Sequence, residues 1–446
     1  MKGTVMQWEQ LLTTIRFGQE EWYNPSVGHD ARTEFQRDFD RLIFSAPFRR
    51  LQNKTQVFPL PGSIFVHNRL THSLEVSCVG RSLGNRVSSA LKGIYPLRGS
   101  QLDLIGPIVS AACLAHDMGN PPFGHSGEQA IGTYFSEGEG QIWKDILSEN
   151  QWSDCIHFEG NANVFRLLTH QFQGRRRGGF VLTYSTLASI VKYPYLSVLS
   201  PKGKFGFFDS DKDNYRIIAS QLGIPLADGK EGMYARFPLV YLVEAADDIC
   251  YQIMDIEDAT KLRILTVDET KDLLLGFFPS PRKDKILKTM AFVDDTNEQI
   301  AYLRSCVIGC LVDSCTDVFM ENEETIMRGD FTGSLIKHIE TPIAEAYARC
   351  ADVSRAKIYR SQEVLDVELA GYKIISTLMN ELVEAAFHPN KAYSRQLLQR
   401  IPAQYSINSE VPYLKLQAML DYISGMTDVY ALDLYQKITG MSLPAI

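Results

Sequence analysis

The amino-acid sequence predicts an all-α protein, and three observations support this prediction. Apolar residues recur at helical spacing through most of the chain, whereas the alternation typical of strands is rare. Only Lys204–Asp211, which reads KFGFFDSD, suggests a small hairpin. The 446 residues, 45% of them hydrophobic and 22% charged, are ordinary for a globular chain that buries a large core.

Two helices are expected in the first third of the chain. In Thr71–Leu91 an apolar stripe recurs at helical intervals and contains His72, Val76, Val79, Leu83 and Ala90. His72 is therefore expected on the side of its helix that faces the core. Leu104–His116 is apolar enough to be a buried helix, and three helix-breaking residues follow it: Gly119, Pro121 and Pro122. His116 and Asp117 then lie at the last turn of this helix.

Helical periodicity continues to the C-terminus. Further helices are expected at Phe237–Asp258, Ile286–Glu321, Ile336–Ala348, Glu363–Ala386 and Leu416–Ile438. No long Gly/Ser-rich or Pro-rich linker divides the chain, and the best candidate boundary is a turn at Pro279–Lys285. We expect residues 1–280 to form one domain with an N-terminal helical arm. Residues 281–446 are expected to be a helical extension packed on it, so that the two make one compact body.

Composition and charge narrow the class of protein. A net charge of −8 disfavours a surface built mainly to bind nucleic acid, although a local basic patch is compatible with it. The first 22 residues are interrupted by charge, unlike a signal peptide, and no apolar run reaches the roughly 20 residues of a membrane span. The 8 cysteines are scattered without a CxxC pair and are typical of reduced core cysteines. These features predict a cytoplasmic, enzyme-sized protein.

The residues of the sequence that suggest a metal site are histidines and aspartates. Adjacent residues at a helix end, such as His116 and Asp117, can bind one ion where the chain turns. Imidazole nitrogen and carboxylate oxygen suit Mn, Fe, Co, Ni or Zn, and such sites accept Mg when water completes the shell. Alone, His72 is more often a hydrogen-bonded core histidine, and Asp247 alone is more often a solvated helix residue. Together the four residues favour a metal site.

The order of these residues resembles the metal-binding signature of the HD superfamily of phosphohydrolases. The surrounding segments resemble more closely its deoxynucleoside triphosphate triphosphohydrolases, the dGTPase-like branch. Four segments carry this resemblance: HDMGNPPFGHSGE, FEGNAN, FRRLQNKTQVFPL and SGMTDVYALDLY. The match runs from about Arg32 to about Gly440. It implies an HD-domain helical phosphohydrolase fold, with the HD catalytic domain in residues 1–280.

The resemblance also implies an open catalytic metal site. One divalent ion per active site (Mn, Mg, Fe, Co or Ni) would be held by His72, His116, Asp117 and Asp247. A loop rich in Gly and Pro carries His125 and Glu128 past this site, so that His125 can transfer a proton while Glu128 orients it. The alternative is structural, with His125 capping the next helix and Glu128 in its first turn.

The resemblance further implies how a nucleotide is bound. Asp247, Tyr251 and Asp255 recur every four residues and so share a helical stripe, and the last two would contact the sugar. Tyr251 is the candidate that excludes a 2′-hydroxyl, and its alternative is a tyrosine at the edge of the core. Gln56 resembles the contact to the 3′-hydroxyl. The triphosphate would be contacted by Arg69, one helical turn before His72, and by Asn161, Lys192, Tyr193 and Lys204.

The activity implied is hydrolysis of 2′-deoxynucleoside 5′-triphosphates, dGTP among them, at the α-phosphate. The products would be deoxynucleoside and tripolyphosphate, and the role would be control of dNTP pools. No Walker A pattern or GxSxG elbow is present, which excludes those routes of hydrolysis. Two alternatives stay open: another HD phosphomonoesterase or phosphodiesterase that acts on nucleotides, and a non-catalytic module that binds nucleotide or nucleic acid.

Partners beyond the dNTP substrate are also implied by the resemblance. Members of the family assemble into homo-oligomers, hexamers in particular, and some bind single-stranded DNA or are activated by nucleotides. The tract GRRRGG at Gly174–Gly179 resembles an insertion in the family pattern. Arginines in such a loop, here Arg175–Arg177, are usually just solvated; the alternative is that they bind an effector nucleotide, a polyphosphate product or single-stranded DNA.

Overall fold

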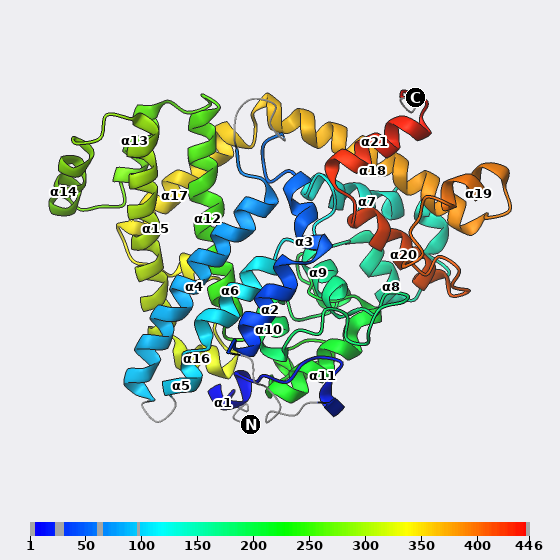
Figure 1. Ribbon diagram of the computed structural model, residues 1–446, viewed down its shortest axis with the longest axis horizontal. Helices are drawn as coiled ribbons and strands as arrows, with labels where there is room; N and C mark the ends of the chain where they lie inside the picture. The colour runs from blue at the N-terminus through cyan, green and yellow to red at the C-terminus, as the bar shows by residue number, and fades with distance from the viewer. Residues whose placement is uncertain (1–4, 23–30, 60–65, 96–98, 443–446) are drawn as a thin grey trace.

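The predicted all-α fold is confirmed. The computed structural model describes residues 5–22, 31–59, 66–95 and 99–442. Within these ranges the chain forms helices joined by turns and loops, with isolated β-bridges but no strand (Figure 1).

Helices from most of the chain enclose a first hydrophobic core. They are α1 (Trp8–Leu11), α2 (Glu34–Ile43), α3 (Ala46–Arg50), α4 (Arg69–Ile94), α5 (Gly99–Leu102), α6 (Ile105–Ala115), α10 (Tyr184–Ile190), α11 (Lys212–Leu222), α12 (Val240–Lys261), α13 (Val267–Leu275), α14 (Ser280–Met290), α15 (Thr296–Glu321), α16 (Glu323–Arg328) and α17 (Ile343–Val353).

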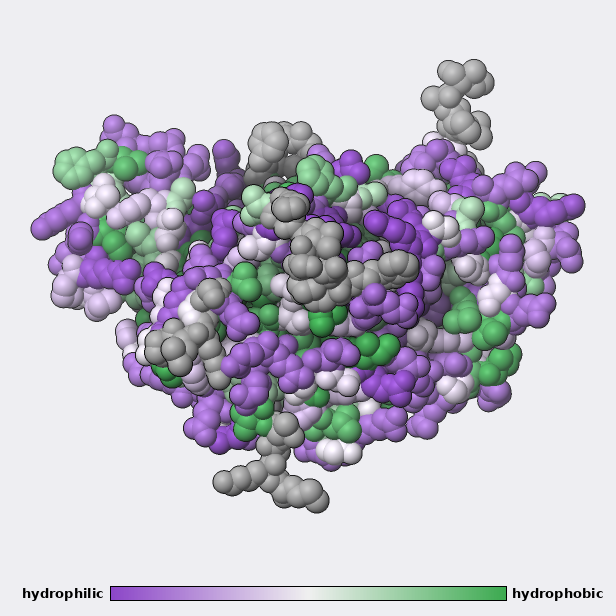
Figure 2. All heavy atoms as spheres, turned by 60° about the horizontal axis from the view of Figure 1, so that its bottom comes forward, coloured by the Kyte–Doolittle hydropathy of each residue, from purple (hydrophilic) through white to green (hydrophobic). Residues whose placement is uncertain are grey.

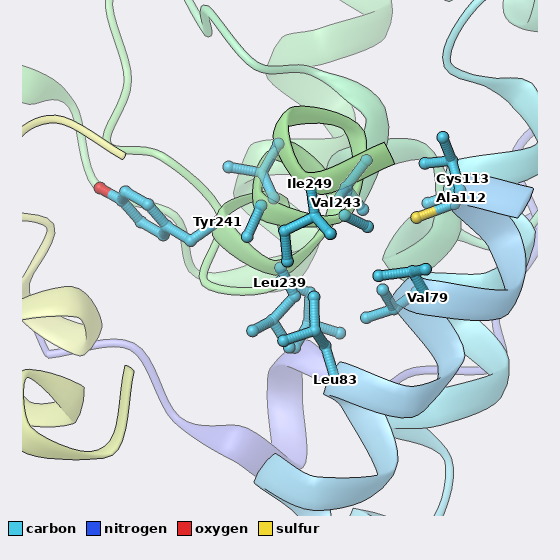
Figure 3. Close-up of a cluster of buried hydrophobic side chains, with 14 of the residues drawn as sticks. Val79, Leu83, Ala112, Cys113, Leu239, Tyr241, Val243 and Ile249 are labelled. Carbon is cyan, nitrogen blue, oxygen red and sulfur yellow. The ribbon is translucent and has the colours of Figure 1, made fainter. Parts of the chain in front are cut away.

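The centre of this core is the contact between α4, α6 and α12. Figure 3 shows Val79 and Leu83 of α4 directed at the same apolar space as Cys113 of α6 and Ile249 of α12. Burying such side chains contributes roughly 1.5–3 kcal/mol each. Because each of these helices also carries candidate metal ligands, their packing fixes the relative positions of those ligands.

Helices α4 and α6 approach each other closely because glycines meet at their crossing. A Cβ atom on Gly84 would lie 2.8 Å from the Cα atom of Gly106. At its start, α4 is fixed by a capping box in which Asn68 and Thr71 each accept the other's backbone N–H. The register of α4, and with it the position of His72, is therefore determined by both packing and capping.

A second hydrophobic core lies under the long helix α18. Figure 1 shows α18 crossing the top of the molecule, and it packs against α7, α19, α20 and α21. The helices of this core are α7 (His125–Ser136), α8 (Glu149–Ile156), α18 (Gln362–Phe387), α19 (Ala392–Leu398), α20 (Pro412–Ser424) and α21 (Asp428–Ile438). Helix α9 (Gly160–Thr169) contributes to both cores, because Ala162 belongs to the second and Phe165 to the first.

Three expected helices have different limits in the structure. Leu416–Ile438 is two helices, because Thr427 caps a new helix by accepting the N–H of Tyr430. Ile286–Glu321 is likewise divided between α14 and α15, and Asp295 caps the second helix. The stretch expected at Ile336–Ala348 begins as a 3-10 turn, and α17 starts only at Ile343, after Pro342.

The suggested hairpin at Lys204–Asp211 is wrong. Its aromatic residues do not alternate between core and solvent. Instead, Phe205 and Phe208 are buried in the second core and Phe207 in the first. The segment ends in a 3-10 turn, Asp209–Asp211. Packing between two cores therefore outweighs the weak strand preference of these residues.

Other sequence features can be compared with the structure directly. All eight cysteines are free, and six of them are buried. No helix in the described ranges is long and apolar enough to cross a membrane. On the face shown in Figure 2, hydrophilic residues predominate and hydrophobic ones lie between them in small groups.

Candidate active site

The four predicted metal ligands lie together where α4, the end of α6 and α12 meet. Nε2 of His72 is 3.1 Å from Oδ1 of Asp247, and Nε2 of His116 is 3.5 Å from the same oxygen. One ligand atom each from His72, His116 and Asp117 falls within 4.8 Å of the others. The structure thus brings two imidazoles and two carboxylates from three helical segments to one place.

The chemistry of this group fits a divalent cation. Nδ1 of His116 lies 2.6 Å from the carbonyl oxygen of Cys113, to which it donates a hydrogen bond. This bond leaves Nε2 free, and Nε2 is buried without a hydrogen-bond partner among the described residues. Metal-binding histidines typically donate their other ring N–H to a carbonyl or carboxylate oxygen in this way. The two histidines and two aspartates therefore form a suitable set of mixed nitrogen and oxygen donors.

Charges around the group are strongly coupled. Burial lowers the pKa of His116, but the carboxylates of Asp117 and Asp247 outweigh burial and raise this pKa to about 9. Burial would raise the pKa of Asp247, yet the imidazoles of His116 and His72 hold it well below its usual range. The carboxylates thus stabilise positive charge at this point, whether a proton or a metal ion supplies it.

Asp117 is held in place by two further side chains. Arg69 donates a hydrogen bond from Nη1 to Oδ2 of Asp117 at 2.7 Å. Asn120 donates one to Oδ1 at 2.5 Å. Burial raises the pKa of Asp117, but the guanidinium of Arg69 and the imidazoles of His116 and His72 together outweigh burial, so the net shift is downward. Asp117 is therefore an ionised, oriented ligand candidate.

His125 and Glu128 form a hydrogen-bonded pair at the start of α7. Nδ1 of His125 lies 3.0 Å from Oε2 of Glu128. The preceding Gly124 has φ 56° and ψ −124°, a conformation that only glycine adopts easily. Oε1 of Glu128 accepts the N–H of Gly160 at 2.8 Å. Glu128 does lie in the first turn of its helix, but its carboxylate connects His125 to α9.

A cleft of about 210 Å³ opens beside these groups, and we call it the histidine cleft. Of the predicted site residues, it is lined by Arg69, His116, Asp117, His125, Glu128, Asn161, Lys192, Lys204 and Asp247. His72 lies behind them and is almost fully buried. Three of the four candidate metal ligands, the candidate proton-transfer pair and four candidate phosphate contacts thus line one cleft.

The cationic side chains of the cleft are paired with acids. Lys204 lies 2.7 Å from a carboxylate oxygen of Glu159, and Lys192 lies 3.2 Å from one of Glu244. Asn161 donates a hydrogen bond to Glu159 at 2.6 Å. If an anionic ligand entered the cleft, its oxygens would replace these acids as the partners of the lysines and of Asn161.

Other predicted residues lie outside the cleft lining. Tyr251 and Asp255 follow Asp247 on α12, as the four-residue spacing predicts, and Tyr251 is 37% exposed. Gln56 has a buried side-chain oxygen that finds no partner among the described residues. Tyr193 is half-buried, and its ring lies 5.8 Å from Nζ of Lys192. The structure therefore does not bring the whole predicted nucleotide set into a single cavity.

Sequence reasoning missed Tyr359, which contacts both Tyr251 and Asp255 of α12. Its hydroxyl donates a hydrogen bond to Oδ2 of Asp255 at 2.7 Å. Its ring stacks on that of Tyr251, with centroids 5.9 Å apart and planes at 25°. Tyr359 follows a π-helical turn, Ser354–Ile358, and no local spacing connects it to α12.

Three cleft residues were also missed, although two lie in segments that the resemblance uses. Asn120 falls in HDMGNPPFGHSGE and Glu159 in FEGNAN. The third, Glu244, comes one helical turn before Asp247 and holds both Lys192 and Arg236. Their residue types alone did not distinguish these three residues from their neighbours as candidate site residues.

Comparisons with known proteins agree with the all-α fold and identify an HD domain. The chain matches the HD domain over residues 69–154 and the phosphohydrolase-associated domain over residues 338–437. It is 38% identical to a deoxyguanosinetriphosphate triphosphohydrolase-like protein of Pseudomonas aeruginosa (strain LESB58), over 99% of this chain and 100% of the relative. A protein of the same description from Synechocystis sp. is 34% identical, over 98% and 100% of the two chains.

A deoxyguanosinetriphosphate triphosphohydrolase of Yersinia enterocolitica is 29% identical, over 91% of this chain and 93% of the relative. Together, the helical fold, the histidine cleft and these matches define an HD-domain phosphohydrolase, so the protein is an enzyme of the hydrolase class. Within that class, the chain belongs to the deoxyguanosinetriphosphate triphosphohydrolase-like family.

Proposed function

We propose that the protein hydrolyses 2′-deoxynucleoside 5′-triphosphates, dGTP and other dNTPs, at the α-phosphate. Water attacks the α-phosphorus and the bond to the 5′-oxygen breaks, so that deoxynucleoside and tripolyphosphate are released. The observation that carries this proposal is that three candidate metal ligands, the His125–Glu128 pair and the candidate phosphate contacts line one cleft, with the fourth candidate ligand, His72, directly behind it. In a cell, this reaction would lower dNTP pools.

His72, His116, Asp117 and Asp247 would hold the divalent ion. Such an ion, when bound, polarises phosphate oxygens and lowers the pKa of bound water. Its charge would replace the proton that Asp117 and Asp247 favour on His116. Arg69 keeps Asp117 ionised and in position for this role.

His125 is suited to supply the proton that the departing 5′-oxygen requires. Its hydrogen bond to Glu128 is the largest influence on its pKa, which is raised above the usual value. A raised pKa favours the protonated imidazole, which is the form that a general acid requires. Glu128 is fixed by Gly160 and so orients the imidazole.

Lys192, Lys204 and Asn161 would bind the phosphate chain, which carries about four negative charges. Arg69 lines the same cleft and would add a further cation for this chain. Tyr251, Tyr359 and Asp255 would contact the sugar, where a tyrosine ring leaves no room or partner for a 2′-hydroxyl. Gln56 and Tyr193 complete the proposed set, with Gln56 offering its unpaired oxygen to the 3′-hydroxyl.

The products of dGTP test this function. A digest made with Mn or Mg, separated by ion exchange, is expected to contain deoxyguanosine and tripolyphosphate in equal amounts. Release of orthophosphate or pyrophosphate instead would indicate a phosphomonoesterase or another phosphohydrolase. Binding of dGTP without metal-dependent turnover would indicate a non-catalytic module.

A further inference from the structure

A cavity of about 370 Å³ is lined by residues from the end of α7, from the 3-10 turn Glu139–Trp143 and from the C-terminal half of α18. We call it the tryptophan cavity and define it by six residues of its lining: Tyr134, Glu139, Ile142, Trp143, Glu381 and Phe387. Among the described residues, none lines both this cavity and the histidine cleft. The tryptophan cavity is therefore a separate site.

Aromatic rings form one side of the tryptophan cavity. The ring centroids of Trp143 and Phe387 lie 4.2 Å apart, with their planes at 44°. Tyr134 is held against Gly140, where an added Cβ atom would lie 2.7 Å from Cε1 of the tyrosine ring. Lys415, which is not part of the lining, places Nζ 5.0 Å from the ring centroid of Phe387. Because aromatic faces attract cations, this packed aromatic surface suits a positively charged ligand.

Two carboxylates of the tryptophan cavity have no cationic partner. Neither Glu139 nor Glu381 forms an ion pair with a residue in the described part of the chain. A third carboxylate in the lining, that of Glu384, is already paired with Lys391 and lies 3.2 Å from Nδ1 of His388. Carboxylates beside aromatic and apolar surface match a cation at the end of an apolar stem.

The indole N–H of Trp143 is a buried donor that lacks an acceptor. The side chain is only 7% exposed, and Nε1 finds no hydrogen-bond partner among the described residues. Burial raises the pKa of Tyr134 to about 12, and the indole opposes this rise without forming a hydrogen bond to the hydroxyl. An unpaired buried donor is costly, so an oxygen acceptor on a ligand would stabilise it. The matching ligand therefore carries both a cation and an acceptor oxygen.

We propose that the tryptophan cavity binds a lysine or arginine residue of a partner protein. The stem of that side chain lies on the aromatic rings, its charge lies near Glu139 and Glu381, and its backbone carbonyl accepts the N–H of Trp143. A free amino acid would bring its own carboxylate to a cavity lined by three glutamates, which disfavours it. Ile142, 66% exposed in the lining, offers apolar surface to the flanking residues of the partner. This inference does not depend on the proposed hydrolysis.

Binding of small probes to the full-length protein tests the proposal. N-acetyl-lysine N-methylamide and its arginine counterpart are titrated and their Kd values measured by ligand-observed NMR. Two analogues each lack one feature: n-butylamine has no carbonyl, and N-acetyl-norleucine N-methylamide has no charge. Each is expected to bind at least roughly fivefold more weakly than the lysine probe. Equal binding of the norleucine analogue would indicate an apolar occupant, equal binding of n-butylamine would indicate a simple amine, and either result would overturn the proposal.

Removing the two unpaired carboxylates tests where the probe binds. In Glu139→Gln/Glu381→Gln, the Kd of the lysine probe is expected to rise roughly tenfold. The matched control is Glu363→Gln/Asp366→Asn, which removes the same charge from exposed positions at the other end of α18 and should bind as the parent does. Equal weakening in both double variants would reduce the effect to net charge and overturn the proposal, as would unchanged binding in Glu139→Gln/Glu381→Gln.

Replacing Trp143 tests the acceptor. Trp143→Phe keeps an aromatic ring beside Phe387 but removes the N–H. Binding of the lysine probe is expected to weaken to roughly that of n-butylamine, whose own Kd is expected to stay the same and so reports that the cavity is intact. If the variant weakened both probes equally, or neither, the N–H would not bind the carbonyl and the proposal would be overturned.

Discussion

Nδ1 of His125 lies 3.0 Å from Oε2 of Glu128, and the other oxygen of that carboxylate accepts the N–H of Gly160. The carboxylate therefore connects an exposed imidazole to the buried start of α9. A histidine that only capped its helix would not require this connection. The arrangement orients the ring toward the cleft and stabilises its protonated form.

Replacing Glu128 with Gln is expected to lower kcat by roughly 10-fold to 100-fold, because His125, the proposed general acid, loses its partner. The hydrogen bond from Glu128 is the largest cause of the raised pKa of His125, so the variant's histidine titrates at lower pH. Since the proposed mechanism requires protonated His125, the alkaline limb of the kcat/KM profile is expected to move to lower pH. The same limb in parent and variant would contradict the role of the pair. His125→Gln serves as the control that removes the limb.

Chelation tests the proposed metal site of His72, His116, Asp117 and Asp247. Treatment with EDTA is expected to abolish activity, and added Mn is expected to restore it and raise the Tm of the parent. At 100 times its Kd, a bound ion stabilises the folded state by about 2.7 kcal/mol. In Asp247→Asn, added Mn is expected neither to restore activity nor to raise the Tm. The control is Asp248→Asn on the same helix, which is expected to respond to Mn as the parent does. Burial raises the pKa of Asp248 to about 7, so its carboxyl is already partly neutral near that pH and the amide changes it less. A Tm response to Mn in Asp247→Asn would place the ion elsewhere.

The residues that the sequence predicted well are those on long, regular helices. The apolar stripe of α4 predicted that His72 faces the core, and the structure confirms this, with His72 1% exposed. Four-residue spacing likewise predicted that Asp247, Tyr251 and Asp255 share α12. Periodicity determines which face of a helix a residue occupies, so it is informative wherever a helix is long.

What the sequence could not predict depends on contacts between distant segments. Tyr359 donates to Asp255 across 104 positions in the chain, and no local pattern encodes that contact. Breaks within helical stretches, such as the one before Asp428, depend on a capping residue that periodicity ignores. The aromatic run at Phe205–Phe208 was similarly misread, because two cores take up its side chains.

Removing the hydroxyl of Tyr359 tests the proposed sugar contacts of Tyr251, Tyr359 and Asp255. In Tyr359→Phe the ring still stacks on Tyr251, but Asp255 loses its hydrogen bond to the hydroxyl. In the parent, burial raises the pKa of Asp255 to about 8, and this hydrogen bond partly offsets the effect of burial. The ratio of kcat/KM for dGTP to that for GTP is expected to fall roughly tenfold. Tyr372→Phe, on α18 and 37% exposed, is the matched control. An unchanged ratio in Tyr359→Phe would separate Asp255 from sugar recognition.

Asp154 predicts a pH dependence of folding that is independent of catalysis. Its carboxylate is buried between Ser197, Tyr413 and the backbone N–H of Asp209, each within 2.7 Å. Burial is the largest cause of its shift and raises its pKa to about 7, although these hydrogen bonds oppose the shift. In the unfolded chain the pKa is about 3.9. The folded state therefore binds the proton more tightly, so this contribution to stability is complete below about pH 4 and is lost as pH rises through about 7.

Asp154→Asn removes that dependence while keeping the shape of the side chain. The amide oxygen can accept from Tyr413 and Asp209, and the amide nitrogen can donate to the hydroxyl of Ser197. Between pH 4.5 and pH 7.5, the free energy of unfolding of the variant is expected to rise relative to that of the parent, by on the order of 4 kcal/mol at most. Urea denaturation at the two pH values measures this difference. Asp213→Asn, at an exposed position of α11, is expected to show no such pH-dependent change. If the free energy of unfolding of Asp154→Asn differed from that of the parent by the same amount at both pH values, Asp154 would be ionised throughout this range.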